Sequence, residues 1–289
     1  IEGLHQAEGF ATHRDHRTPF VTHQRKGEGR TVLITGASAG IGMALSHVFA
    51  RRGYAIILVA RRKDRLDALK AQLEAVHGVR AFSLPADLAK IEAPDEIMEA
   101  LHAFGLPIDA LVNNAGYNLR GATPDNPWAA KRDMLQAMAI APYALTHLLL
   151  PAMRERKFGR ILNVASVVGL LPAGVANTLY SGVKAMQVAF SEALHIDERK
   201  HGIHVTALCP GLTYSEFHDV DGSRAQMQKI PKFLWHTSES VAEAGYAALD
   251  RNAMICAPGL FYRTGIAAAR MLPRRLANRI AARIARGAR

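Results

Sequence analysis

Cysteine is scarce in this chain of 289 residues, which contains only Cys209 and Cys256. The two lie far apart in apolar, strand-like runs, so we expect buried thiols in a reducing cytoplasm and no disulfide framework. No stretch reaches the roughly 18 uninterrupted apolar residues of a transmembrane helix, and the first thirty residues lack the apolar centre of a signal peptide. The expected location is therefore cytoplasmic.

Acidic residues are missing from the end of the chain. Residues 261–289 carry eight arginines and no Asp or Glu, which accounts for most of the net charge of +11. The central part is close to neutral, so nucleic-acid binding is not expected as the main role. Residues 274–286 place leucine or isoleucine at every fourth position beside a stripe of arginines. This pattern predicts a basic amphipathic helix that either contacts an anionic membrane at its periphery or docks on its own domain or on a second subunit.

Short β-branched runs alternate with longer segments of helical spacing from residue 31 onward. The runs are TVLIT (31–35), YAIILVA (54–60), VRAFSL (79–84), IDALVNN (108–114), RILNVAS (160–166), IHVTALC (203–209) and AMICA (253–257). This alternation, with runs apolar almost throughout, favours a parallel sheet buried on both faces. The predicted fold is α/β: a single doubly wound, Rossmann-like domain over residues 31–258, with a mainly parallel seven-stranded sheet and helices on both faces. Residues 1–30 are expected to be a loose extension or a cloning remnant, and residues 259–289 a basic C-terminal extension.

A glycine-rich turn, TGASAGIG (35–42), follows the first run directly. Gly36 suits the tight turn, Gly40 lets the backbone approach a pyrophosphate, and Gly42 lets the following helix pack close to the sheet. The helix starting near Ile41 would direct free amide groups and its positive end at that phosphate. Because the glycines follow a strand and open a helix, they predict a dinucleotide site rather than a flexible turn.

No acidic residue occurs between positions 43 and 63, where an NAD site uses an acid to accept from the ribose 2′-hydroxyl. The second strand ends instead in Arg61 and Arg62, whose guanidinium groups suit a 2′-phosphate. Solvated loop arginines are the alternative. The missing acid favours the phosphate, so the predicted cofactor is NADP(H).

A tyrosine and a lysine stand four positions apart in TLYSGVKAM (178–186). On a helix, Tyr180 and Lys184 would lie side by side. An adjacent ammonium lowers the pKa of a phenol from its reference of about 10 by roughly one to three units. That shift would let Tyr180 donate or accept a proton near neutral pH. An ordinary helix surface gives the same spacing, so the pair needs support from the rest of the chain.

Four motifs together resemble those of the short-chain dehydrogenase/reductase family. They occur in the family's order and at its usual separations, and the resemblance spans about residues 31–258. The motifs are TGASAGIG, NNAG at 113–116, Ser166 and YSGVK at 180–184. The resemblance implies an oxidoreductase that reduces a carbonyl or oxidises a secondary alcohol with NADP(H). An epimerase or lyase-type use of the Tyr/Lys pair is a further option within enzymes.

The resemblance also implies roles for single residues. Tyr180 would be the general acid in reduction or the base in oxidation, Lys184 would lower its pKa and bind the nicotinamide ribose, and Ser166 would hold the substrate oxygen. Hydride transfer to a ketone develops an alkoxide, which such donors stabilise. No metal is expected. The residues expected to bind the cofactor are Gly36, Ser38, Gly40, Ile41, Gly42, Arg61, Arg62, Asp87, Leu88, Asn113, Ala115, Gly116, Tyr180, Lys184, Pro210, Gly211, Thr213 and Ser215.

An apolar pocket is expected beside the catalytic residues. The segment 212–237 is rich in aromatic residues and lacks a clear secondary-structure pattern, which predicts either a substrate lid or simple packing onto the domain. We therefore expect a fairly hydrophobic carbonyl or alcohol substrate. The resembled family forms subunit contacts through helices near 127–156 and 174–200, which implies a homodimer or homotetramer. The residues expected to line the substrate pocket are Tyr117, Val168, Tyr214 and Phe217.

One residue of the family pattern is missing. An asparagine usually lies about thirteen positions before Pro151 and takes part in a water-linked proton relay from the lysine to solvent. Met138 stands there instead, and no asparagine occurs between 127 and 162. A thioether is a weak acceptor and donates nothing, while Gln136 faces another side of the helix. Two hypotheses follow: an active reductase with rerouted or slower proton delivery, or a cofactor-binding protein with weak or no turnover.

Overall fold

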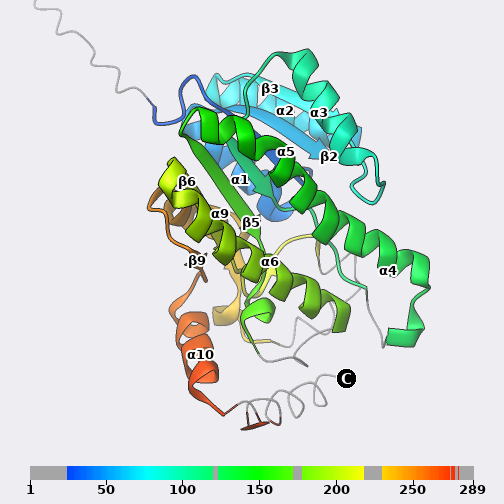
Figure 1. Cartoon of the computed structure of the whole chain (residues 1–289), viewed down its shortest axis with the longest axis vertical. Coiled ribbons are helices and arrows are strands. Elements are labelled where there is room, and N and C mark those ends of the chain that lie inside the picture. Colours follow the sequence, from blue (N-terminus) through cyan, green and yellow to red (C-terminus); the bar gives the residue numbers. More distant parts are fainter. Residues whose placement is uncertain are drawn as a thin grey trace, which may run out of the picture.

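One parallel sheet forms the centre of the protein (Figure 1). The computed structural model describes residues 25–119, 123–171, 178–217, 230–273, 275–276 and 279. In this part of the chain, seven strands pair in the order β3-β2-β1-β4-β5-β6-β9, which confirms the predicted α/β fold. The strands are β1 (Thr31–Thr35), β2 (Ala55–Ala60), β3 (Ala81–Pro85), β4 (Ala110–Asn113), β5 (Gly159–Val164), β6 (Ile203–Leu208) and β9 (Ile255–Cys256).

Helices cover both faces of the sheet because successive strand residues point to opposite sides. Val32 and Ile34 pack on one side with α1 (Gly40–Arg51), α2 (Lys63–His77) and α9 (Ser238–Asp250). Leu33, between them, packs on the other side. The helices of that second side are α3 (Ala93–Phe104), α4 (Trp128–Leu135), α5 (Ala141–Glu155) and α6 (Thr178–Glu198). This double burial explains why the strand sequences are apolar almost throughout.

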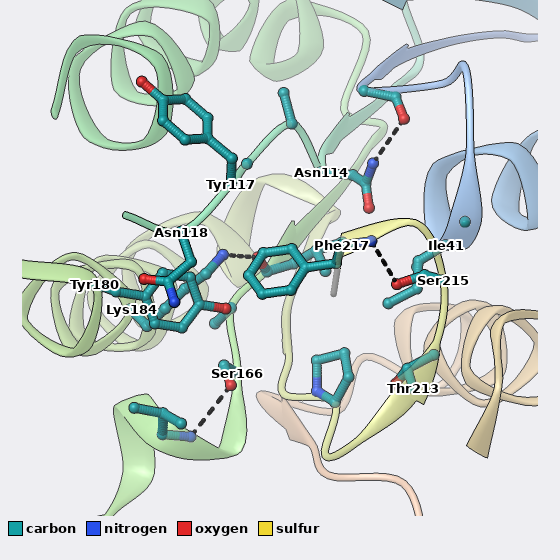
Figure 2. A pocket seen from close by; sticks show the side chains of 18 of the residues that line it. Ile41, Asn114, Tyr117, Asn118, Ser166, Tyr180, Lys184, Thr213, Ser215 and Phe217 are labelled. Atoms are coloured by element: carbon teal, nitrogen blue, oxygen red, sulfur yellow. Dashed lines mark hydrogen bonds between the residues drawn. The ribbon is translucent and has the colours of Figure 1, made fainter. Parts of the chain in front are cut away.

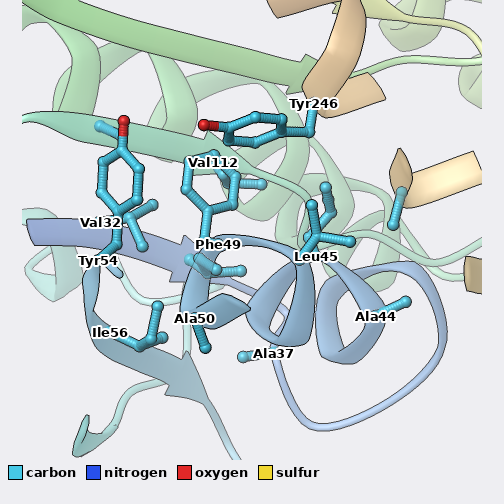
Figure 3. Close-up of a cluster of buried hydrophobic side chains, with 14 of the residues drawn as sticks. Val32, Ala37, Ala44, Leu45, Phe49, Ala50, Tyr54, Ile56, Val112 and Tyr246 are labelled. Carbon is cyan, nitrogen blue, oxygen red and sulfur yellow. The ribbon is translucent and has the colours of Figure 1, made fainter. Parts of the chain in front are cut away.

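Aromatic packing fixes the position of α1, the helix that follows the glycine-rich turn. The Phe49 ring lies between the rings of Tyr54 and Tyr246, with centroid separations of 5.1 and 5.0 Å and edge-to-face geometry (Figure 3). All three residues are buried. Such pairs add about 0.5–1.5 kcal/mol each beyond the burial of their area. The last turn of α1 is thereby packed between the start of β2 and helix α9.

A wide turn separates α4 from α5. Residues Gln136–Ile140 form a π-helical turn, a feature that often marks functional sites in helices. The whole helix Trp128–Glu155 is long and apolar enough, by length and composition alone, to cross a membrane. In its most apolar window, 56% of the residues are buried inside the protein, so this test is weak evidence for a membrane span.

The domain begins before the boundary expected from the sequence. The Gly27 amide donates to the Arg52 carbonyl at 2.8 Å, Lys26 pairs with Asp250 at 2.8 Å, and the Arg30 carbonyl accepts from Ala55. Residues 25–30 are therefore attached to the domain, although a short polar turn of this kind has no apolar periodicity to reveal it. Residues 1–24 lie outside the described part.

The domain also continues past residue 258. Helix α10 (Leu260–Met271) returns to the sheet edge, and its Ile266 is buried against the end of β6. The segment 259–289, which the sequence predicts to be a basic extension, therefore begins with a helix that belongs to the domain. The sequence does not show which part of the domain covers the apolar face of this helix. Only residues 275, 276 and 279 of the helix predicted over 274–286 are described.

Short elements organise the segment expected to be a substrate lid. Strands β7 (Thr213–Tyr214) and β8 (His236–Thr237) pair in parallel, and η5 (Lys232–Leu234) precedes β8. The segment is therefore partly structured. Residues 218–229, which include Met227, lie outside the described part.

Candidate active site

The turn between β1 and α1 forms a backbone cradle. Gly36 and Gly40 adopt φ values of 66° and 54°, which favour glycine because a Cβ would be crowded by the backbone in this conformation. The Asn114 amide nitrogen donates to the carbonyls of Thr35 and Gly36 at 3.0 and 3.1 Å, tying this turn to the end of β4. Ala39, at the N-cap of α1, has no side-chain oxygen, so the first amides of the helix are left for another acceptor.

A cleft of about 1110 Å³ opens at the carboxyl ends of the strands. It lies where the strand order reverses between β1 and β4, the place where open α/β sheets bind ligands. Most residues predicted to bind the cofactor line it. They are Gly36, Ser38, Gly40, Ile41, Arg61, Arg62, Asp87, Leu88, Ala115, Gly116, Tyr180, Lys184, Pro210, Gly211, Thr213 and Ser215.

Two predicted residues lie beneath the cleft rather than in its lining. A Cβ on Gly42 would stand 2.2 Å from the Gly36 carbonyl oxygen, so Gly42 permits the close contact of helix and turn. Asn113 is buried, and its amide nitrogen donates to Asn163 Oδ1 at 2.8 Å and Thr146 Oγ1 at 3.3 Å. The Asn113 side chain therefore points into the core beside α5, where it holds the end of β4, and its contact with the cofactor stays a prediction. Its neighbour Asn114 lines the cleft instead.

The residues predicted to be catalytic converge on this cleft (Figure 2). Ser166 follows β5, and its hydroxyl accepts from the Val168 amide at 3.3 Å, which leaves the hydroxyl proton available to another acceptor. Tyr180 and Lys184 lie one turn apart on α6, with the ammonium 5.6 Å from the centroid of the phenol ring. Three groups from β5 and α6 thus face one space.

Lys184 is buried, with 4% of its surface exposed. Its ammonium donates to the Val164 carbonyl at 2.8 Å and to Gln187 Oε1 at 2.9 Å. Burial lowers the pKa of Lys184 to about 7. The ammonium therefore gains and loses its proton in the neutral range, where it can influence the neighbouring phenol.

Charged residues gather at the far end of the cleft. Arg62 donates to Glu216 at 3.0 Å and to Ser38 Oγ at 3.0 Å, and Arg65 also donates to Glu216. These hydrogen bonds, first from Arg65 and then from Arg62, lower the pKa of Glu216. Arg61 lines the same end. Glu216 was missed in the sequence because 154 residues separate it from Arg62.

The opposite end of the cleft is mostly apolar, and α10 supplies part of its wall. The Tyr262 hydroxyl accepts from the Leu212 amide at 3.0 Å and donates to the Leu234 carbonyl at 2.8 Å, which holds α10 over the segment after β6. Tyr117, Val168 and Phe217, the other residues predicted for the substrate pocket, line the cleft, and the centroid of the Phe217 ring lies 5.8 Å from that of Tyr180 (Figure 2). Helix α10 and the residue after it also line the cleft, which the sequence did not reveal, through Phe261, Tyr262, Gly265, Ile266, Ala269 and Leu272.

Tyr214 is not among the residues that line this cleft, so its place in the substrate pocket gains no support. It belongs to β7, and its ring stacks on Trp235 at a centroid distance of 4.7 Å. The side chain is 47% exposed and borders a smaller neighbouring hollow. Thr213, the preceding residue, is buried and lines the cleft, because successive strand residues point to opposite sides.

These features fit a dinucleotide-dependent oxidoreductase. The glycine cradle and uncapped helix end suit a pyrophosphate, and the hydroxyls of Ser166 and Tyr180 lie in the same cleft. The profile of the family described as short chain dehydrogenase matches residues 30–225. The chain belongs to the short-chain dehydrogenase/reductase family, and it is an oxidoreductase of the class that acts on alcohol and carbonyl groups with a nicotinamide cofactor.

Known proteins share this fold and sequence pattern. The chain is 31% identical over 225 residues to ketoacyl reductase HetN of Nostoc sp., covering 78% of this chain and 76% of that protein. A short-chain dehydrogenase from Sphingobium yanoikuyae, solved in complex with NADPH, has a TM-score of 0.75 and 30% identity, with coverage of 83% and 93%. The bulky-bulky ketone specific alcohol dehydrogenase from Comamonas testosteroni has a TM-score of 0.70 and 27% identity, with coverage of 84% and 99%.

Proposed function

We propose that the protein reduces a carbonyl, or oxidises a secondary alcohol, on a hydrophobic substrate with NADP(H). The observation that carries this proposal is the convergence of Ser166, Tyr180 and Lys184 on one cleft that also contains the glycine cradle. When bound, the cofactor supplies or accepts the hydride. The chain itself has to orient the substrate oxygen and move one proton.

Each catalytic side chain then has a distinct role. Ser166 donates its hydroxyl proton in a hydrogen bond to the substrate oxygen and stabilises the charge that develops there. Tyr180 transfers the proton that completes reduction, or removes it in oxidation. Lys184, protonated, favours the phenolate form of Tyr180 by its charge and binds the nicotinamide ribose. The apolar residues that line the neighbouring half of the cleft keep water away from these three catalytic side chains.

The preference for the phosphorylated cofactor rests on Arg61 and Arg62. Both border the cleft at the end of β2, and guanidinium groups bind phosphate through charge-assisted hydrogen bonds. Glu216 competes for Arg62, since it accepts a hydrogen bond from that residue. The Sphingobium yanoikuyae relative in complex with NADPH supports this assignment.

Replacing Arg62 with alanine should weaken NADPH binding and leave NADH binding nearly unchanged. Loss of a charged hydrogen bond costs about 1.5–3 kcal/mol, so the Kd for NADPH should rise about tenfold to a hundredfold. Fluorescence titration with both nucleotides measures the ratio. Glu216→Gln should strengthen NADPH binding, because it frees Arg62 for the phosphate. Arg65→Ala removes the same charge from a residue outside the cleft lining and is the charge-matched control. An unchanged NADPH/NADH ratio in Arg62→Ala would contradict the NADP(H) assignment.

The apolar end of the cleft supports a hydrophobic substrate. Val168 and Phe217 border this space together with α10, and such apolar surfaces bind apolar groups by the hydrophobic effect. A structural relative is described as specific for bulky-bulky ketones. A substrate with two sizeable apolar groups on its carbonyl carbon therefore fits our proposal best.

A panel of ketones and aldehydes tests the substrate class. NADPH oxidation should be faster with bulky aryl or alicyclic ketones than with small polar sugars. Ala269→Trp would fill the apolar end, and we expect it to lower kcat/KM for a bulky ketone by about tenfold or more, with little change for a small aldehyde. Ala268→Trp, on the exposed side of the same helix, is the matched control. Faster turnover of polar sugars by the unaltered enzyme would contradict the proposal.

A cofactor-binding protein with weak or no turnover is the alternative that Met138 raises. It predicts nucleotide binding without substrate-dependent NADPH oxidation. Cytoplasmic location, a homodimer or homotetramer, and membrane contact through residues 274–286 stay predictions.

A further inference from the structure

A buried glutamine on the same helix accepts a hydrogen bond from the catalytic lysine. Gln187 lies three residues after Lys184 on α6, where side chains are neighbours. Its Oε1 accepts from the lysine ammonium at 2.9 Å, and the side chain is buried, with 6% of the residue exposed. A lysine ammonium has three donors. Gln187 and the Val164 carbonyl take two of them among the described residues, which leaves the third for the cleft that Lys184 lines.

The other end of the same amide binds the residue that replaces the family's asparagine. Gln187 Nε2 donates to the Met138 carbonyl at 2.7 Å. In an ordinary helix that carbonyl accepts from the residue four positions later, which here is Pro142 and has no N–H. Lysine can only donate and a carbonyl can only accept, so the two partners fix which way the amide of Gln187 points.

The backbone of Gln187 is anchored as well. Its carbonyl accepts from the Ser191 hydroxyl at 2.6 Å, and that hydroxyl accepts from Asn163 Nδ2 at 2.9 Å. Asn163 in turn accepts from Asn113 on the neighbouring strand. These buried hydrogen bonds connect α6 to β5 and β4, so Gln187 belongs to a rigid polar network rather than to a mobile surface.

We propose that Gln187 is a positioning residue whose fixed amide takes the place of the water-linked relay. It orients the Lys184 ammonium toward Tyr180. It also blocks proton exchange between Lys184 and solvent on the side of the lysine away from the cleft. An amide has no proton that it releases in the neutral range, so the proton that Tyr180 transfers must be exchanged through the cleft. This inference rests on the proposed function for its catalytic meaning. The orientation of the lysine can be tested without turnover.

Two ionisable groups of the described part of the chain lie near Lys184. Tyr180 lies on the same helix, and Cys209 lies just past the end of β6. Burial raises the pKa of Cys209 to about 12, so this thiol stays neutral through the range in which the lysine titrates. Changes in the charge of Lys184 should therefore be visible mainly at Tyr180.

The test is the ionisation of Tyr180 in the cofactor-free protein. Tyrosinate absorbance is measured as a function of pH in each protein and in its Tyr180→Phe version. The difference between the two curves isolates the ionisation of Tyr180, which we call the Tyr180 step. Gln187→Leu removes an acceptor of the lysine proton, which disfavours the ammonium and so disfavours the phenolate beside it. We expect the Tyr180 step to move to higher pH by about one unit. Thermal unfolding verifies that the variant is folded.

Gln136 provides a matched control. It is equally buried and lies in the π-helical turn beside Met138, and its Nε2 has no hydrogen-bond partner among the described residues. Gln136→Leu should leave the Tyr180 step in place. If Gln187→Leu does not fold, Gln187→Met keeps an unbranched side chain and also removes the amide acceptor, so it should move the step to higher pH in the same way. A step that stays in place in a folded Gln187 variant overturns the proposal.

Turnover gives the second readout. Alcohol oxidation needs the phenolate, so the acid limb of kcat/KM should move to higher pH in Gln187→Leu, with about a tenfold loss at pH 7 for a one-unit shift. NADPH affinity, measured by fluorescence, should fall much less. If the unaltered protein oxidises no alcohol but the Tyr180 step still moves in the variant, the proposed function fails and the positioning role of Gln187 stands.

Discussion

Tyr180→Phe should lower the turnover number about a thousandfold, since general acid–base catalysis contributes roughly 10²–10⁴-fold. The variant loses only the phenolic hydroxyl, and its ring can keep the contact with Phe217. Folding and nucleotide affinity should therefore change little. The measurement is NADPH oxidation with a bulky ketone, next to fluorescence titration of NADPH and thermal unfolding on the same preparations.

The matched control is Tyr214→Phe. This tyrosine is half-exposed and lies outside the cleft lining, so its hydroxyl has no place in the proposed mechanism and turnover should stay within about twofold, a difference of under 0.5 kcal/mol in the barrier. Full activity in Tyr180→Phe would refute the proton-transfer role of Tyr180. Nucleotide binding without turnover in the unaltered protein would favour the cofactor-binding alternative.

Gly42→Ala should destabilise the protein and weaken nucleotide binding together. A Cβ at this position would lie 2.2 Å from the Gly36 oxygen and 2.4 Å from Asn114 Nδ2, and neither contact can relax without moving the turn or the helix. Overpacking of this kind costs about 1–3 kcal/mol or more. Denaturant unfolding measures the loss of stability, and fluorescence titration should show a weaker affinity for NADPH because the cradle opens.

Gly182→Ala is the control for that substitution. Gly182 is an exposed helical glycine on α6, and an added Cβ would meet no atom within 4 Å among the described residues. Alanine is favoured over glycine in helices by up to about 1 kcal/mol, so this variant should be slightly more stable. If Gly42→Ala were as stable as Gly182→Ala, the close contact of α1 with its turn would not be required.

The Met138 position shows how far sequence reasoning reaches. The sequence shows that Met138 stands in place of the asparagine, and the only side-chain amide that it offers nearby is that of Gln136. The structure places the amide on another helix, where Gln187 joins Lys184 to the Met138 carbonyl. The spacing of Lys184 and Gln187 could have suggested their contact. The contact with Met138 spans 49 residues and depends on how α6 packs against the π-helical turn.

Helix α10 illustrates a second limit. Its sequence has no acidic residue and a basic continuation, which favours a surface extension. The structure instead packs Tyr262 against Gly211, where an added Cβ would stand 2.1 Å from the ring. A helix of this length has several faces, and only its partner determines which of them is buried.

The sequence by itself determined the strands, the glycine cradle and the neighbouring pair on α6, because each depends on residues close together in the chain. Continuous apolar runs, the turn that glycine permits and the helical spacing of Tyr180 and Lys184 are local properties. Tertiary structure alone decided that Glu216 meets Arg62, that α10 walls the apolar end, and that Asn113 and Tyr214 turn away from the cleft. These outcomes depend on contacts between distant segments, whose register follows from packing of the whole domain.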